Sequence, residues 1–155
     1  MPGEMQAGIC AGDDYAVFEA GPARIGLLLC GDVFFPENYI NIGRLNPDIL
    51  FIPTTSPFRP ADSLSARKRR DKQYFQDGAK TAGAYVVKVC GVGEFMNKPL
   101  QGRSLIAAPW EILKQVSHSS KHSPRIISAT FDLDELREFR QRMNRSSVET
   151  VSRSI

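Results

Sequence analysis

The stretch Arg24-Ile-Gly-Leu-Leu-Leu-Cys30-Gly-Asp32-Val-Phe-Phe-Pro36-Glu37 is the part of the sequence that decides the fold. Its apolar residues have the character of a buried β-strand, and the run ends on Cys30 before it breaks through Gly31, Asp32 and Pro36. α/β enzymes often present a nucleophile in this way, because the strand fixes the sulfur, the turn exposes it and free backbone N–H groups point toward the reacting atom. The pattern predicts a nucleophilic role for Cys30, against the alternative of a buried structural thiol.

The bulk composition indicates a single globular domain. The chain has 155 residues, 42% of them hydrophobic and 24% charged, and no linker divides it. We expect one domain over residues 1–145, followed by a polar tail over 146–155. A net charge of +3 is too small to indicate nucleic acid, and no apolar run is long enough to span a membrane. Three cysteines without zinc-type spacing favour free thiols in a reducing compartment, so we expect a cytoplasmic protein with no metal or cofactor.

Strands and helices alternate along the sequence, which predicts an α/β layered domain. The expected strands lie at residues 15–18, 23–30, 48–52, 85–89, 104–108, 110–116 and 125–131. The expected helices lie at residues 36–44, at residues 62–83 and from residue 132 onward. Asp62 or Ser63 is expected to cap the second helix, and Asp132 with Glu135 forms a capping box at the third.

The segment around Cys30 resembles the nucleophile motif of the carbon–nitrogen hydrolase (nitrilase) superfamily. In that motif a strand is followed by Cys-x-Asp, two further positions and Phe-Pro-Glu, and here Gly31 replaces a usually larger residue. Segments 46–53, 84–93 and 101–104 resemble later parts of the family in the same order. The resemblance implies a four-layer αββα sandwich, of which this chain carries the part with the nucleophile and lacks the N-terminal portion.

The resemblance also implies acyl transfer, with amidase or glutaminase-type members the nearest. Cys30 would attack the carbon of a small amide or nitrile, and water would hydrolyse the resulting thioester. The backbone N–H of Gly31 would stabilise the oxyanion, and Thr55, Ser56 and Phe58 would bind the substrate.

Part of the family's catalytic set has no counterpart ahead of Cys30. The family's Glu and Lys lie upstream of the cysteine, whereas the 29 residues upstream here contain no lysine, and only Glu4 is matched to an auxiliary Glu. We therefore expect weak activity from the chain alone. The alternative is a catalytically inactive nitrilase-like remnant that serves as a binding or dimerisation module. An incomplete sandwich would expose strand edges and an apolar sheet face, so we expect a homo-oligomer.

Three further features have structural interpretations. The basic run Arg67-Lys-Arg-Arg70 is typical of a solvated helix face, and it lacks the aromatic residues of a nucleic-acid site. A third hypothesis, a basic interaction domain built on this run, predicts salt-sensitive nucleic-acid binding. Asp32 is expected to hydrogen-bond the turn after Cys30, and Cys90 to be a small packed residue.

Overall fold

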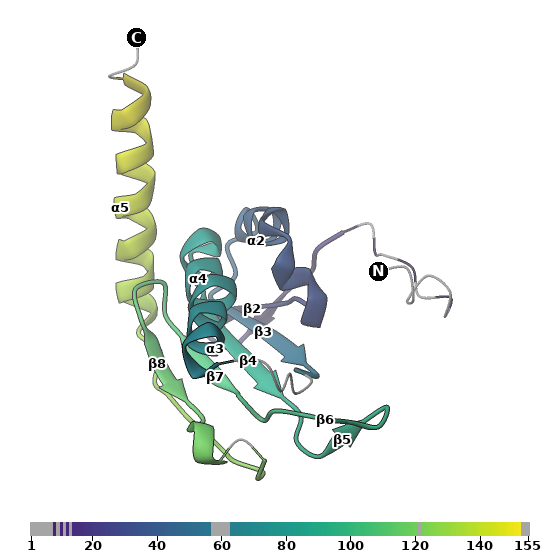
Figure 1. The fold of residues 1–155 in the computed structure, drawn as a ribbon. Helices are drawn as coiled ribbons and strands as arrows, with labels where there is room; N and C mark the ends of the chain where they lie inside the picture. Colours follow the sequence, from purple (N-terminus) through teal and green to yellow (C-terminus); the bar gives the residue numbers. More distant parts are fainter. Residues whose placement is uncertain are drawn as a thin grey trace.

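A mixed six-stranded sheet forms the centre of the computed structural model, which describes residues 8, 10, 12, 14–56, 63–120 and 122–152 (Figure 1). The strands lie side by side in the order β1-β2-β3-β4-β7-β8. Their bounds are Val17–Ala20 (β1), Ala23–Leu27 (β2), Ile49–Thr54 (β3), Tyr85–Cys90 (β4), Leu105–Ala107 (β7) and Ile112–Gln115 (β8). The α/β class expected from the sequence is therefore confirmed.

The central strands share one direction, which brings their ends together. β2, β3 and β4 run parallel, with Ile25 opposite Ile49 and Ile49 opposite Tyr85. β1, β7 and β8 each run antiparallel to the strand beside them. A separate hairpin pairs β5 (Glu94–Phe95) with β6 (Lys98–Pro99). Because parallel strands end at the same edge of a sheet, the residues that follow β2, β3 and β4 lie near one another.

Helical segments connect the strands. Their bounds are Cys30–Phe34 (η1), Pro36–Gly43 (α2), Leu64–Asp71 (α3), Lys72–Gln76 (η2, a π-helical turn), Asp77–Ala82 (α4), His118–Ser120 (η3) and Leu133–Ser152 (α5). α3, η2 and α4 follow one another without a break, which confirms the predicted helix from residue 64 to residue 82. Ser63 caps it, because its Oγ accepts the N–H of Ala66 at 3.1 Å, and Gly83 ends it with a φ of +61°. Asp62, the other expected cap, lies outside the described residues. None of the described helices combines the length and the apolar character that crossing a bilayer requires.

One face of the sheet is covered by α2, η2 and α4 (Figure 1). Their apolar side chains pack on alternate residues of β3 and β4, and Ile42, Leu50 and Val86 have no exposed surface. α2 and α4 approach so closely at Gly78 that a β-carbon on this residue would lie 2.3 Å from the Tyr39 ring. The main core therefore lies between the sheet and these helices.

The opposite face is covered at one end by described residues. There α5 and the segment before it pack on Tyr85, whose hydroxyl donates to the Asp132 carbonyl at 2.9 Å. Beyond this end, Phe18, Leu27 and Val89 are 53%, 48% and 48% exposed. The structure thus presents the exposed apolar sheet face that the sequence led us to expect. We call this surface the bare face.

Three elements differ from the sequence prediction. Residues 125–131 form no strand, and Ile126 is fully exposed. A high β-propensity makes a strand only where a neighbouring strand is in place to form its hydrogen bonds. The β5–β6 hairpin was not predicted, because its turn at Met96 and Asn97, with φ of +50° and +57°, lacks the glycine that usually marks such turns. α5 continues to Ser152, past the boundary placed at residue 145, and that domain boundary stays a prediction.

Candidate active site

The predicted nucleophile lies where the parallel strands end. Cys30 comes three residues after β2, Thr55 comes directly after β3, and Cys90 is the last residue of β4. In open α/β sheets, ligands bind in the crevice outside the carboxyl ends of the strands. The topology therefore places these three side chains at the edge of the sheet where a binding site is expected.

Cys30 has a backbone conformation that is unusual for its residue type. Its φ is +36°, in the left-handed region that residues other than glycine rarely adopt, and its side chain is exposed. Such a conformation costs about 1–3 kcal/mol and persists only when surrounding contacts enforce it. Asp32 supplies those contacts, because its Oδ2 accepts the N–H of Leu29 and its own N–H donates to the Leu29 carbonyl, each at 2.7 Å. The predicted role of Asp32 in the turn is thereby confirmed.

Gly31 lies in the first turn of η1, directly after the sulfur-bearing residue. The first N–H groups of a helix have no intrahelical acceptor, and those of η1 include the N–H of Gly31. That N–H is a suitable donor to an oxyanion formed beside Cys30, and the role stays a prediction.

The structure brings one predicted substrate-binding residue to the nucleophile. Thr55 is exposed, and its Oγ1 lies 3.8 Å from Cys30 Sγ. Ser56 turns toward β4 instead, with its Oγ 3.4 Å from Cys90 Sγ. Phe58 and Glu4 lie outside the described residues.

Sequence reasoning missed the contact between Thr54 and Cys90. Thr54 is the partner of Cys90 in the pairing of β3 with β4, and its Oγ1 lies 3.0 Å from Cys90 Sγ. Both are the last residues of their strands, whereas the sequence pattern placed the ends of these strands at residues 52 and 89. The order β3-β4 depends on contacts distant in sequence, so the sequence alone did not give this pair.

A buried charge cluster lies between α3 and the sheet. Asp71 is 2% exposed and accepts hydrogen bonds from Lys88 Nζ at 3.0 Å, from Gln115 Nε2 at 2.7 Å and from Arg103. Burial lowers the pKa of Arg103, and the Asp71 carboxylate raises it again. Arg67 is 4% exposed, so the prediction of a solvated face was wrong for this residue. Arg67 lies one helical turn before Asp71, so the two side chains share the buried side of α3.

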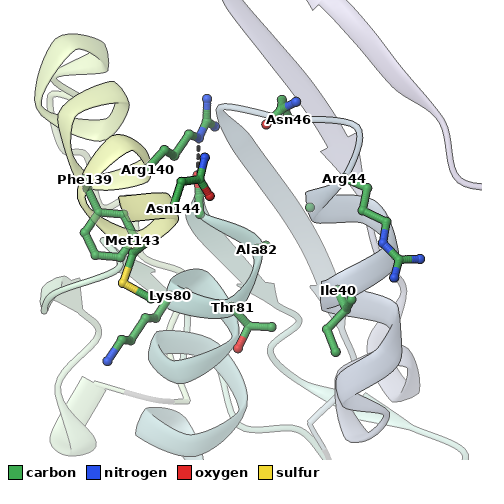
Figure 2. Close-up of a pocket in the computed structure, with 12 residues that line it drawn as sticks. Ile40, Arg44, Asn46, Lys80, Thr81, Ala82, Phe139, Arg140, Met143 and Asn144 are labelled. Carbon is green, nitrogen blue, oxygen red and sulfur yellow. Dashed lines mark hydrogen bonds between the residues drawn. The ribbon is translucent and has the colours of Figure 1, made fainter. Parts of the chain in front are cut away.

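A groove of about 450 Å³ lies at the other end of the parallel strands from Cys30 (Figure 2). α2, α4 and α5 line it together with Asn46 and Gly83, which precede β3 and β4. Arg140 lies at its margin and donates to the Gly83 carbonyl at 2.7 Å and to Asp48 Oδ1 at 3.2 Å. Burial lowers the pKa of Arg140, and Asp48 raises it. The described residues that line the groove include no cysteine, histidine or carboxylate, so we place the candidate site at Cys30.

Comparison with known sequences identifies related proteins. Residues 2–141 match the family model described as carbon-nitrogen hydrolase. Deaminated glutathione amidase of Dictyostelium discoideum is 29% identical over 100 residues, which are 64% of this chain and 32% of the relative. N-carbamoylputrescine amidase of Arabidopsis thaliana is 29% identical over 138 residues, which cover 82% of this chain and 44% of the relative. The chain thus spans less than half the length of these curated relatives.

Solved structures share the fold. A carbon-nitrogen hydrolase from Helicobacter pylori G27 superposes with a TM-score of 0.71 at 20% identity, over 86% of this chain and 48% of that protein. The amidase of Nesterenkonia sp. AN1 gives a TM-score of 0.68 at 18% identity in its complex with butyramide, over 92% of this chain and 51% of that protein. The family model covers most of the residues of the chain, and the TM-scores show that the described fold is shared with these structures. The chain belongs to the carbon–nitrogen hydrolase family.

Proposed function

We propose that this chain carries the nucleophile of an amidase-type carbon–nitrogen hydrolase, and that Cys30 cleaves a non-peptide C–N bond through a thioester. The observation that carries the proposal is the exposed Cys30 thiol, held at a positive φ at the carboxyl end of β2. The amidase names of the relatives support it. So does the Nesterenkonia amidase, one variant of which shows Michael addition of acrylamide at its active-site cysteine.

The chemistry has two steps. The Cys30 thiolate attacks the amide carbon, the C–N bond breaks, and ammonia or an amine leaves with a proton. Water then attacks the thioester, the C–S bond breaks, and a carboxylic acid and the thiol are released. The N–H of Gly31 stabilises the oxyanion in both steps. The Thr55 hydroxyl, 3.8 Å from the sulfur, binds the substrate so that its reacting carbon faces Cys30.

None of the described residues in contact with Cys30 Sγ can act as the general base. Among the residues that the structure describes, Thr55 is the one whose side chain reaches Cys30 Sγ within hydrogen-bonding distance. A threonine hydroxyl does not remove a proton at neutral pH, so an isolated chain with these groups alone acts slowly. Glu4 remains the proposed auxiliary carboxylate, and association between copies is the proposed state in the cytoplasm. We further propose Ser56 and Phe58 as substrate-binding residues and residues 1–145 as one domain.

Acylation by an activated ester tests the proposal. This reaction requires the nucleophile, but its leaving group departs without the help that an amine needs. We expect p-nitrophenyl acetate to release a burst of nitrophenolate with one acetyl group on Cys30, located by peptide mass spectrometry. Cys30→Ala should abolish the burst, and Cys10→Ser, which changes another exposed thiol, should leave it intact. An unchanged burst in Cys30→Ala would disprove the proposed nucleophile, and a missing burst in the wild-type chain would favour the inactive remnant.

A further inference from the structure

We infer that Cys90 is a positioning residue for Cys30. Its thiol holds the turn formed by residues 54–56 in the conformation that places the Thr55 hydroxyl at the Cys30 sulfur. The inference rests on the proposed function of Cys30, and it assigns to Cys90 a role that goes beyond filling space at the end of β4.

Three polar side chains form a closed triangle at the ends of β3 and β4. Cys90 Sγ lies 3.0 Å from Thr54 Oγ1 and 3.4 Å from Ser56 Oγ, and the two hydroxyl oxygens are 3.0 Å apart. Each group has one hydrogen to donate and lone pairs to accept, so all three can be satisfied within the triangle. Cys90 therefore binds the residues on both sides of Thr55.

The turn that Cys90 contacts is strained and needs such support. Ser56 has a φ of +45°, in the left-handed region. Two backbone hydrogen bonds hold the turn from elsewhere, from Gln101 N–H to the Ser56 carbonyl at 3.0 Å and from Gly91 N–H to the Thr54 carbonyl at 3.3 Å. Within the triangle, Cys90 is the member that ties this turn to β4.

Cys90 is itself held in place. Its N–H donates to Ser104 Oγ at 3.0 Å, and its backbone pairs with Thr54 in the parallel ladder. The sulfur is therefore a fixed point to which the hydroxyl groups of Thr54 and Ser56 are bound.

The contact between Thr55 and Cys30 depends on this arrangement and is sensitive to small movements of the turn. Thr55 Oγ1 lies 3.8 Å from Cys30 Sγ, close to the longest separation at which sulfur takes part in a hydrogen bond. A small outward shift of the turn would break the contact. A hydroxyl group that donates to the sulfur stabilises the thiolate, which is the reacting species.

A purely space-filling role predicts a different mutational pattern. Alanine and serine are both smaller than cysteine, so both would leave Cys30 equally unaffected if Cys90 only packed. If Cys90 positions the turn, serine retains the hydrogen bonds to Thr54 and Ser56, and alanine loses them.

Site-resolved alkylation of the full chain separates these roles. We measure the rate at which iodoacetamide modifies Cys30 by peptide mass spectrometry, in Cys90→Ala, Cys90→Ser and the control Val89→Ala, whose side chain is on the bare face. We expect the Cys30 rate to fall about threefold or more in Cys90→Ala and to stay within about twofold of wild type in the other two variants. Circular dichroism verifies that each variant is folded.

The inference is overturned if folded Cys90→Ala reacts at the wild-type rate, or if Cys90→Ser loses as much rate as Cys90→Ala. If Cys90→Ala does not fold, Thr54→Val replaces it, because it removes one corner of the triangle with little change in shape. The Cys30 rate should then fall in the same way, and an unchanged rate overturns the inference. Alkylation requires no acyl-enzyme, so failure of the wild-type chain to be acylated counts against the proposed function alone.

Discussion

The two faces of the central sheet are built from the same strands but have different surroundings. On the helix-covered face, Ile42, Leu50 and Val86 have no exposed surface. On the bare face, Leu27 and Val89 are each 48% exposed, although Val89 lies in the same strand as Val86. Strand periodicity therefore supplies two apolar faces. Described helices cover the central strands on one face, whereas on the other face they cover only the end where α5 packs. The candidate site lies at the edge between them.

The largest expected effect concerns the charge cluster that fixes the helix-covered face. Asp71→Ala leaves the buried Lys88 and Arg103 without their carboxylate, and we expect a loss of about 3–5 kcal/mol in the free energy of unfolding, measured with urea. Asp134→Ala is the matched control, because it removes an exposed partner of Arg137 and should cost less than about 0.5 kcal/mol. Equal losses in the two variants would show that the cluster does not hold this face.

The second effect is the difference in the free energy of unfolding between matched leucine variants on the two faces. Leu50→Ala removes a fully buried side chain, and we expect a loss of about 2–5 kcal/mol. Leu27→Ala removes a side chain that is 48% exposed, and the expected loss is below about 1.5 kcal/mol. Urea unfolding of both variants measures the difference. A loss in Leu27→Ala as large as that in Leu50→Ala would mean that another part of the protein covers the bare face.

The smallest expected effect concerns association through the bare face. An apolar surface with unpaired strand edges favours contact between copies, so light scattering should give a mass above the 17.2 kDa of one chain. Replacing Leu27 and Val89 together by lysine should shift the mass toward that of the monomer. Leu64→Lys, which changes an exposed residue of α3, should not shift it. A wild-type chain that stays monomeric at all concentrations would contradict this expectation.

Local signals predicted much of this structure. The Ser63 cap and the turn made by Asp32 depend on residues close in sequence, and the sequence was sufficient to predict both. Burial of Arg67, the absence of a strand at residues 125–131 and the contact of Thr54 with Cys90 depend on which elements become neighbours. Patterns within one segment do not contain that information. For the candidate site, the sequence therefore pointed to Cys30 and its turn but not to the residues that arrange Thr55 beside it.

We propose that the turn at the end of β2 makes Cys30 more reactive than an ordinary exposed thiol. Cys10 and Cys30 are both exposed, so the chain contains its own reference. The most direct measurement is the rate at which acrylamide adds to each cysteine, followed by peptide mass spectrometry over time at neutral pH. We predict that Cys30 is modified at least about tenfold faster than Cys10, because activated cysteines at catalytic sites react as thiolates. Equal rates, or faster modification of Cys10, would contradict the assignment of Cys30 as the nucleophile.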